Sequence, residues 1–341
     1  MRWTFEPARP FARLADRWQR LNARNGDSPL LDPDFVAPLL TEWATGREIV
    51  AIGGDPDDPA AMLLITRARV LDWVTYQPSQ APIGLAVRDP AVAPADLLRG
   101  LQAALPRYCV LFSLLQQDPD FTPRPEENGR LRTVDYIRTA RVAVEGTFDE
   151  YWKARGRNLR KNLKRQRNGL ERDGVATRLE VLERPEEVAE AIAAYGRLES
   201  ASWKAGGGTA IHPDNDQGRF YRAMLESFCR RGEGRIYKYW YGDKLAAMDL
   251  CIHRHGVLII LKTTYDEAIQ ASSPAMLMRQ DAFEEIFSDG AFERIEFYGK
   301  VMDWHTKWSD DIRTLFHVNC ARWPAVWKLR RLLRRGQSAR R

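Results

Sequence analysis

The pattern of apolar and polar positions is most regular between residues 234 and 299. Three apolar segments there are separated by short glycine-containing turns, which is typical of strands. A segment with apolar positions at helical spacing follows, and a short strand pattern comes after it. The predicted elements are strands 234–241, 245–253 and 257–265, a helix over 275–287 and a strand over 294–298.

The same order of elements occurs twice along the chain. The second half is completed by a strand over 175–182, helices over 185–203 and 220–230, and a last strand over 312–320. The first half shows helices over 11–22, 35–43 and 95–104, and strands over 48–52, 62–66, 70–76, 108–114 and 134–144. Ala60-Ala61-Met62 stands at the same place in this order as Ala246-Ala247-Met248, which supports a duplication. We therefore predict an α+β chain with domains over 1–145 and 146–322, followed by a basic helix and tail over 323–341.

Charge distinguishes the two halves. Residues 1–150 hold 17 Arg, no Lys and 21 acidic residues, a net −4, whereas the remainder holds 35 basic and 25 acidic residues, a net +10. The second half is therefore expected to attract anions such as a phosphorylated cofactor, nucleic acid or an anionic membrane face. The four cysteines lie far apart, which favours neither a disulfide framework nor a metal site. Without a membrane-spanning or signal-like segment, we expect a cytoplasmic protein, with peripheral contact to the inner membrane left open.

Ser272, Ser273 and Pro274 connect the third strand of the regular segment to its helix. Free backbone N–H groups and the dipole at a helix start favour an anion, so this turn is a candidate phosphate cradle. Arg279, about one turn further on, is a candidate for an additional phosphate contact. Serine before a helix and proline at its first position are equally typical of an ordinary N-cap, and Arg279 is equally compatible with a solvated charge.

Asp249 shares one face of its strand with Ala247 and Cys251, where a buried carboxylate needs a partner. In a hairpin that turns near His255, Lys262 would lie nearly opposite. A structural Asp249–Lys262 ion pair is one interpretation. The other is a general base or an amine-binding carboxylate that faces a cleft.

Glu199 and Trp203 are four residues apart, so they share one face of a predicted helix. A carboxylate beside an aromatic surface suits an acceptor that carries an ammonium group. The same pair is equally ordinary on an amphipathic helix.

A predicted amphipathic helix begins the second half and is strongly basic. Leu159 and Leu163 mark its apolar side. Its cations are Arg155, Arg157, Arg160, Lys161, Lys164, Arg165 and Arg167. Three interpretations stay open: it binds the phosphates of an acyl-CoA or a tRNA, it lies on an anionic membrane, or it is a solvated helix face.

Taken together, these segments resemble the GNAT acyltransferase superfamily, in its CelD/FemAB-like branch. The resemblance covers about residues 150–320, and the first half only by its plan. It is carried by Asn158–Lys164 with Gly174, Glu199–Trp203, Phe220-Tyr221, Tyr265-Asp266, Ser273-Pro274 with the following helix, and Glu296-Phe297 leading to Trp308. It implies two tandem GNAT-like domains, each a mostly antiparallel mixed sheet flanked by helices, of which the first is a degenerate, non-catalytic copy. Ala275 stands where the branch often has glycine, and His305 where it often has lysine.

The resemblance implies direct transfer of an acyl group from acyl-CoA, acetyl or longer, to a small amine, in cell-envelope or polysaccharide metabolism. No metal is expected. The thioester carbonyl would be held by backbone N–H groups near Thr263, Thr264 and Tyr265. The pyrophosphate would lie at Ser272, Ser273, Ala275, Met276 and Arg279.

Acyl transfer to an amine also needs a base for the amine and an acid for the leaving thiolate. Neutral His305 is a candidate base, oriented by Asp303, and Tyr298 a candidate acid. Glu199 and Asp249 are further candidates for handling the amine, with Trp203, Asp303 and Trp308 as substrate-binding residues.

Two other functions remain open at this point. The FemAB resemblance also implies an aminoacyl-tRNA donor, with which the basic helix is compatible. A non-enzymatic accessory protein at a membrane surface or on nucleic acid is the other, and it is favoured if the cleft is filled by side chains.

Overall fold

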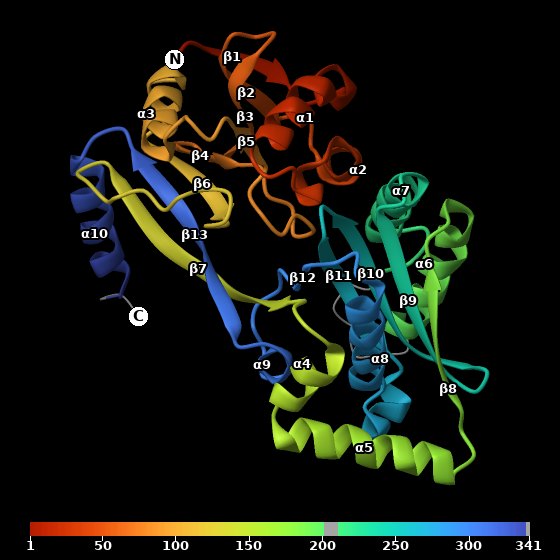
Figure 1. Cartoon of the computed structure of the whole chain (residues 1–341). Coiled ribbons are helices and arrows are strands. Elements are labelled where there is room, and N and C mark those ends of the chain that lie inside the picture. Colours follow the sequence, from red (N-terminus) through yellow and green to blue (C-terminus); the bar gives the residue numbers. More distant parts are fainter. Residues whose placement is uncertain (201–210, 339–341) are drawn as a thin grey trace. The chain divides into compact units, whose positions relative to one another are not determined.

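The computed structural model describes residues 1–200 and 211–338, which form two compact units. The first unit comprises Met1–Ile137 together with Thr314–Arg341, and the second comprises Arg138–Arg313. Each unit combines a largely antiparallel sheet with helices, so the predicted α+β class is confirmed (Figure 1).

The sheet of the second unit has the strand order β8-β9-β10-β11-β12-β7. Its neighbours are antiparallel except for β11 and β12, which run parallel. The strands are β8 (Thr177–Leu182), β9 (Gly234–Tyr241), β10 (Lys244–Arg254), β11 (Val257–Tyr265), β12 (Arg294–Glu296) and the end of β7 (Leu131–Ala143). The three central strands therefore lie where the apolar pattern predicted them.

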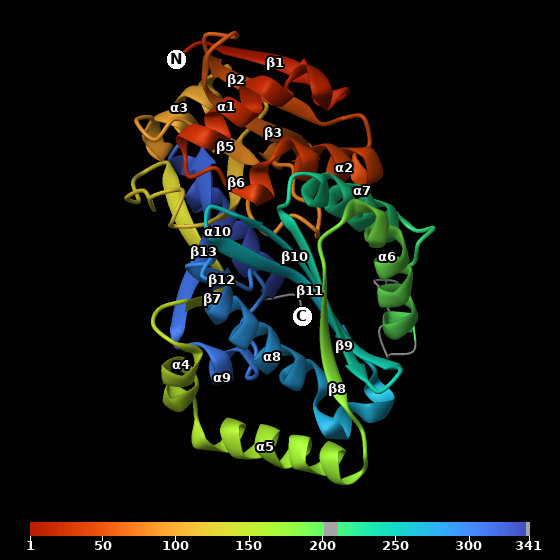
Figure 2. The ribbon, with the colours of Figure 1, turned by 45° about the vertical axis from the view of Figure 1, so that its right-hand side comes forward.

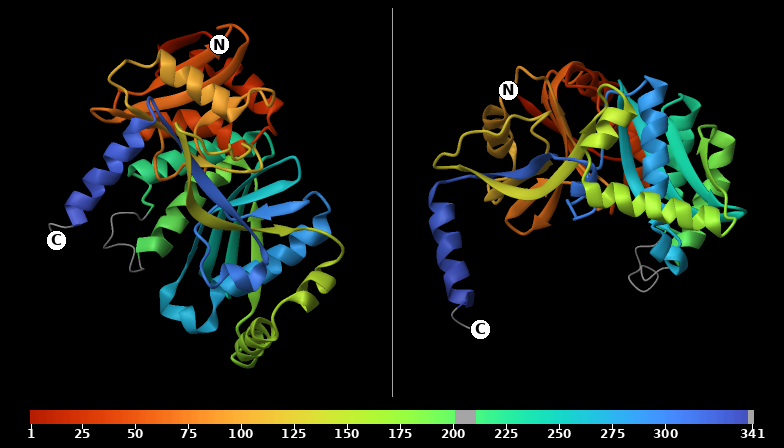
Figure 3. Two further views of the ribbon diagram at one scale, coloured as in Figure 1. Left: turned by 90° about the vertical axis from the view of Figure 1, so that its left-hand side faces the viewer. Right: turned by 60° about the horizontal axis from the view of Figure 1, so that its bottom comes forward.

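Helices cover both faces of this sheet. The bounds are α4 (Phe148–Ala154), α5 (Arg157–Arg172), α6 (Pro185–Ser200), α7 (Asp216–Arg230), the 3-10 segment η4 (Glu267–Ser272), α8 (Pro274–Asp289) and α9 (His305–Trp308). Helices α6 and α7 pack on one face and α8 on the other (Figures 1 and 2). Helix α5 runs past the end of the unit that holds η4, where Gln166 Nε2 donates to the Ala271 carbonyl at 2.9 Å (Figure 3).

The first unit repeats this strand order as β1-β2-β3-β4-β6-β13, with β5 paired to β3, and its one parallel pair is β4–β6. Its strands are β1 (Trp3–Pro7), β2 (Ile49–Gly54), β3 (Pro59–Arg69), β4 (Asp72–Thr75), β5 (Ala86–Arg88), β6 (Leu111–Gln117) and the end of β13 (Asp311–Ala321). Its helices are η1 (Phe11–Arg13), α1 (Ala15–Arg24), η2 (Pro29–Leu31), α2 (Pro33–Trp43), α3 (Pro94–Ala104) and α10 (Ala325–Ser338). The repeated order supports the predicted duplication.

The last strand of each half completes the sheet of the other half. Strand β7 follows β6 in the chain but pairs with β12, and β13 follows β12 but pairs with β6. The units therefore divide the chain near residues 137 and 313, whereas the domains predicted from the sequence are 1–145, 146–322 and 323–341. From their order in the sequence, β7 was assigned to the first domain and β13 to the second. Hydrophobic periodicity predicts a strand, but it does not indicate which sheet the strand joins.

Capping residues set the ends of α4 and the start of α5. Thr147 and Glu150 form a capping box at the start of α4. Gly156, at the N-cap of α5, separates α4 from α5. Arg155 is the C-cap of α4, so the prediction that it belongs to the basic helix is wrong. Strands β1 and β5 were not predicted from the sequence.

Candidate functional site

Strands β11 and β12 diverge after three paired positions, Val257, Leu258 and Ile259 with residues 294–296. Within the described residues, β11 continues to Tyr265 without a strand on that side. Its register against β10 passes from Leu250–Lys262 to Cys251–Ile260, so Leu261 is the extra residue of a β-bulge. Because of the divergence and the bulge, some backbone N–H and C=O groups of β11 make no hydrogen bond to a neighbouring strand among the described residues.

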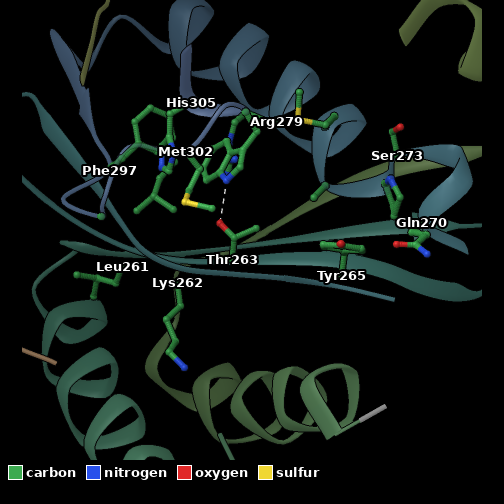
Figure 4. Close-up of a pocket in the computed structure, with 16 residues that line it drawn as sticks. Leu261, Lys262, Thr263, Tyr265, Gln270, Ser273, Arg279, Phe297, Met302 and His305 are labelled. Atoms are coloured by element: carbon green, nitrogen blue, oxygen red, sulfur yellow. Dashed lines mark hydrogen bonds between the residues drawn. The ribbon is translucent and has the colours of Figure 1, made fainter. Parts of the chain in front are cut away.

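A cavity of about 570 Å³ occupies this opening between β11, the start of α8 and the segment after β12 (Figure 4). It is lined by Ile260, Leu261, Lys262, Thr263, Tyr265, Gln270, Ser273, Pro274, Ala275, Met276, Arg279, Phe297, Gly299, Met302, Trp304 and His305. None of these residues carries a carboxylate. Of the predicted donor-binding residues, Thr264 and Ser272 are not among them.

The start of α8 forms one end of the cavity. Ser273 adopts a left-handed conformation (φ 56°), which is uncommon for a residue other than glycine. Its carbonyl accepts from the N–H groups of Met276 and Leu277, both at 3.0 Å. Pro274 has no N–H, and among the described residues no carbonyl accepts from the N–H of Ala275, so this group is a donor at the positive end of the helix. Ser272 turns away, with its Oγ donating to the Ile269 carbonyl at 2.7 Å.

Arg279 lies in the cavity wall and is 2% exposed. Its Nη2 donates to Asp249 Oδ2 at 2.8 Å and to Thr263 Oγ1 at 2.9 Å, an interaction that is visible in Figure 4. The predicted alternative for Asp249, a pair with Lys262, is wrong because Asp249 faces Thr263 across the sheet and Lys262 faces Leu250. Asp249 itself is 2% exposed and does not line the cavity, so its contact with a substrate stays a prediction.

His305 is 4% exposed and also lines the cavity. Its Nδ1 accepts from the Met302 N–H at 2.9 Å, so the neutral ring carries its proton on Nε2. Burial, and after it the positive charge of Arg279, lower the pKa of His305 to about 4. The ring therefore stays neutral near pH 7 and presents a donor to the cavity, which is unfavourable for the predicted role as a base.

The other residues predicted around His305 lie elsewhere. Asp303 is exposed, and its carbonyl accepts from Thr306 Oγ1, while the Nδ1 that it was expected to orient is bonded to Met302. Tyr298 is buried under the Arg313 guanidinium, 5.0 Å from its ring centre, and does not line the cavity. Trp308 is fully buried and stacks on Trp152 at 5.8 Å. Trp308 therefore belongs to the core of the unit.

Glu199 lies on the face of the sheet opposite Arg279. It is 1% exposed, its Oε2 accepts from the Ile211 N–H at 2.7 Å, and Lys262 Nζ lies 3.5 Å from its Oε1. Figure 4 shows Lys262 pointing away from the cavity. Glu199 is therefore placed with Lys262 and not with the other predicted residues, and Trp203 lies outside the described residues.

The basic helix α5 borders a second hollow of about 560 Å³ beside α8. It is lined by Trp152, Arg157, Arg160, Lys161, Lys164, Arg167, Asn168, Glu171 and Gln280. Arg165 lines an adjacent hollow with Arg172. Arg155 is instead turned inward, donating to the Trp308 carbonyl at 3.1 Å and lying 3.2 Å from Asp310.

Several lining residues were not predicted as site residues, notably Leu261, Gln270, Met302 and Trp304. Trp304 lies next to His305 and stacks on it, with ring centres 3.5 Å apart. An aromatic residue beside a candidate histidine was a usable signal. The bulge at Leu261 has no sequence signature.

Within residues 1–200 and 211–338, no group of three or more His, Cys, Asp or Glu side chains is arranged to hold a metal ion. In the same residues, no helix combines the length and apolar character needed to cross a bilayer.

Comparison with known proteins finds a family model that matches part of the chain. Residues 157–306 match the family model of the acetyltransferase (GNAT) domain. Among curated proteins, none is similar enough in sequence to count as a match.

Solved structures with similar folds extend over most of the chain. One is the C-terminal domain of a putative lysylphosphatidylglycerol synthetase from Agrobacterium fabrum, 14% identical with a TM-score of 0.56, covering 90% of this chain and 92% of that one. FemX is 10% identical with a TM-score of 0.56, covering 91% and 97%. L-PGS from Bacillus licheniformis is 12% identical with a TM-score of 0.53, covering 92% of each chain. The family match and these folds confirm the predicted GNAT fold.

Proposed function

Because residues 157–306 carry a GNAT acetyltransferase domain, we propose that this protein is an N-acyltransferase that moves an acyl group from acyl-CoA to an amine. The observation that carries the proposal is the open cavity between diverging strands β11 and β12, which extends to the start of α8. A thioester in this opening would have backbone donors on one side and a helix N-terminus at its end. The first unit would be a non-catalytic copy.

The two ends of the cavity suit the two ends of such a donor. The Ala275 N–H and the dipole of α8 would hold the pyrophosphate, with Ser273 and Met276 beside it. The pantetheine arm would follow β11 past Tyr265 and Thr263. Catalysis would then rest on holding amine and thioester together and on polarising the carbonyl.

The cavity wall gives little support to a base from this chain. It holds no carboxylate, and the free nitrogen of its histidine is a donor. The amine would therefore react in its neutral form after losing its proton to water, or to Glu199 from the other face of the sheet. We also propose that the acyl group is acetyl or longer and that the reaction belongs to cell-envelope or polysaccharide metabolism.

Calorimetric titration of the whole chain with CoA, acetyl-CoA and a long-chain acyl-CoA tests the donor. Ala275→Glu places a carboxylate where the pyrophosphate would lie and should weaken CoA binding at least tenfold. Ala268→Glu is the matched control, because Ala268 is exposed on η4 and does not line the cavity. Absence of CoA binding, or equal weakening by both variants, would contradict the proposed donor.

An aminoacyl-tRNA donor is the second candidate, favoured by the hollow along α5. Arg157, Lys161 and Lys164 line it together, and no partner within the described residues bonds their charged groups. Salt-sensitive tRNA binding that falls in Lys161→Gln/Lys164→Gln, without CoA binding, would establish this alternative. A filled cleft would have favoured the non-enzymatic alternative, and the open cavity of about 570 Å³ gives it no such support.

A further inference from the structure

Two residues that line the cavity, Arg279 and His305, each keep a side-chain N–H group without an acceptor from the described residues. Nη2 of Arg279 donates to both Asp249 and Thr263, and Nε of the same guanidinium is buried without a partner among the described residues. Nη1 is the nitrogen that remains for a ligand. His305 bonds through Nδ1, so its Nε2–H remains as well.

A shared aromatic frame holds these two groups in one region. The His305 ring stacks on Trp304 and meets Phe297 edge-on at 5.1 Å between ring centres. The Arg279 Cζ lies 4.8 Å from the centre of the same indole and 5.4 Å from the centre of the same phenyl ring. Because both side chains are at most 4% exposed and pack on the same two rings, their directions are fixed before a ligand arrives.

The chemistry of the donors selects the group they would bind. Arg279 is already neutralised by Asp249, so a ligand carboxylate would add an unbalanced buried charge, which is costly. A carbonyl oxygen adds no net charge, and it gains negative charge only during reaction. Donors fixed in a buried site are most effective for such an oxygen.

We propose that Arg279 Nη1 and His305 Nε2 form a side-chain oxyanion site for the carbonyl oxygen of the acyl donor. This inference rests on the proposed acyl-CoA function. The neutral amine attacks the carbonyl carbon, a C–N bond forms, and the π electron pair moves to the oxygen between the two N–H groups. When the C=O bond re-forms, the C–S bond breaks, the thiolate leaves, and the proton of the amine nitrogen passes to water or to the sulfur.

The experiment compares acetyl-CoA with S-ethyl-CoA, a thioether that lacks the carbonyl oxygen, by calorimetry on the whole chain. We expect acetyl-CoA to bind at least fivefold more tightly. His305→Phe keeps a stacking ring but removes the donor, and should bring the ratio close to one. His305→Gln restores an N–H donor and should recover part of it. Lys307→Gln, an exposed neighbour that does not line the cavity, should leave the ratio unchanged.

A spectroscopic measurement separates carbonyl polarisation from packing. The infrared stretch of ¹³C-labelled acetyl-CoA should move to lower frequency on binding and return towards its value in water in His305→Phe. Arg279→Met/Asp249→Leu removes the second donor without leaving a buried charge and should act in the same direction.

The possible results have distinct meanings. CoA binding with equal affinities for thioester and thioether, and an unshifted stretch, would overturn the oxyanion site alone. Tighter binding of succinyl-CoA than of acetyl-CoA, with an unshifted stretch, would also overturn it by assigning Arg279 to a carboxylate. Failure of every CoA compound to bind would overturn the proposed function and the inference together.

Discussion

The two units share one strand order, yet the place that is open in the second unit is closed in the first. Both units have a single parallel strand pair with three paired positions, β11–β12 and β4–β6. Beyond the β4–β6 pair of the first unit, the Leu115 N–H donates to Thr75 Oγ1 at 2.9 Å, and this bond bridges the diverging strands. Gln77 Nε2 donates to the carbonyls of Ala81 and Ile83, fixing the loop that follows β4.

The loop after β4 also packs closely on β6, which is a further difference from the second unit. An added Cβ at Gly84 would lie 2.2 Å from the Leu115 carbonyl oxygen, so the loop backbone directly contacts β6. The helix starts differ as well: Ala93 before α3 is extended, whereas Ser273 before α8 is left-handed. A shared topology therefore does not by itself create a donor site. This contrast supports the proposal that the first unit is a non-catalytic copy.

The largest effect should come from the buried ion pair of the second unit. Arg279→Met leaves the Asp249 carboxylate buried without its partner, which should cost about 3–5 kcal/mol in the free energy of unfolding. Arg99→Met in the first unit breaks a pair with Asp96 whose side chains are 68% and 63% exposed, and should cost under about 1 kcal/mol. Urea unfolding measures both variants. Equal losses would show that burial does not distinguish the two pairs.

Each unit also holds a histidine whose pKa is lowered by burial, His305 and His317. Both accept a backbone N–H through Nδ1, from Met302 and Gln116 respectively, each at 2.9 Å. We expect NMR titration to give a pKa of about 4 for His305 and a value below the usual 6.5 for His317. His317 lacks the nearby cation that adds to the shift of His305.

The shift of His305 also predicts how stability depends on pH. Its folded pKa is below its unfolded one, so the unfolded chain binds more protons between pH 6.5 and 4. Stability should therefore fall as the pH drops through this window, by up to about 3 kcal/mol from this group. His305→Phe should lose that part of the pH dependence. A pKa of 6.5 or above for His305 would contradict the desolvation and the effect of Arg279 that lower it in the folded chain.

A methyl group at Gly84 should destabilise the closed unit. Gly84→Ala forces Cβ against the Leu115 carbonyl, and overpacking of this kind costs about 1–3 kcal/mol. Gly169→Ala is the matched change in α5, where an added Cβ meets nothing within 4 Å, and it should stabilise by up to about 1 kcal/mol. Thermal unfolding of both variants tests the contrast, and CoA binding should be unchanged in each. A neutral Gly84→Ala would mean that the loop has room to move away from β6.

Sequence periodicity was sufficient for the elements but not for their pairing. Residues 234–241 and 257–265 were predicted with the bounds of β9 and β11, because a buried strand with clear turns has a local signature. The exchange of β7 and β13 and the bulge at Leu261 were not predicted, since both depend on contacts between distant segments.

The candidate site was predicted only where it depends on a local pattern and not on contacts between distant segments. Ser273, Ala275, Met276 and Arg279 line the cavity because a strand–turn–helix pattern places them at one end of it. The partner of Asp249 was wrong because a one-residue bulge moves Lys262 to the other face of the sheet. The tautomer and lowered pKa of His305 arise from burial and from one backbone N–H, neither of which a sequence pattern indicates.

The smallest predicted effect compares the two helix starts directly, and its sign differs between the units. Ser273 has φ 56°, a conformation that costs a residue with a Cβ about 1–2 kcal/mol, so Ser273→Gly should stabilise the second unit by about 0.5–1 kcal/mol. Ala93 has φ −62°, which alanine adopts without strain, so Ala93→Gly should destabilise the first unit by about 0.4–1 kcal/mol through the greater freedom of the unfolded chain. Thermal unfolding reads both shifts. If Ser273→Gly destabilised the chain instead, contacts of the serine side chain in the cavity wall would outweigh its backbone strain, and Ser273 itself would become the first residue to test for contact with the donor phosphates.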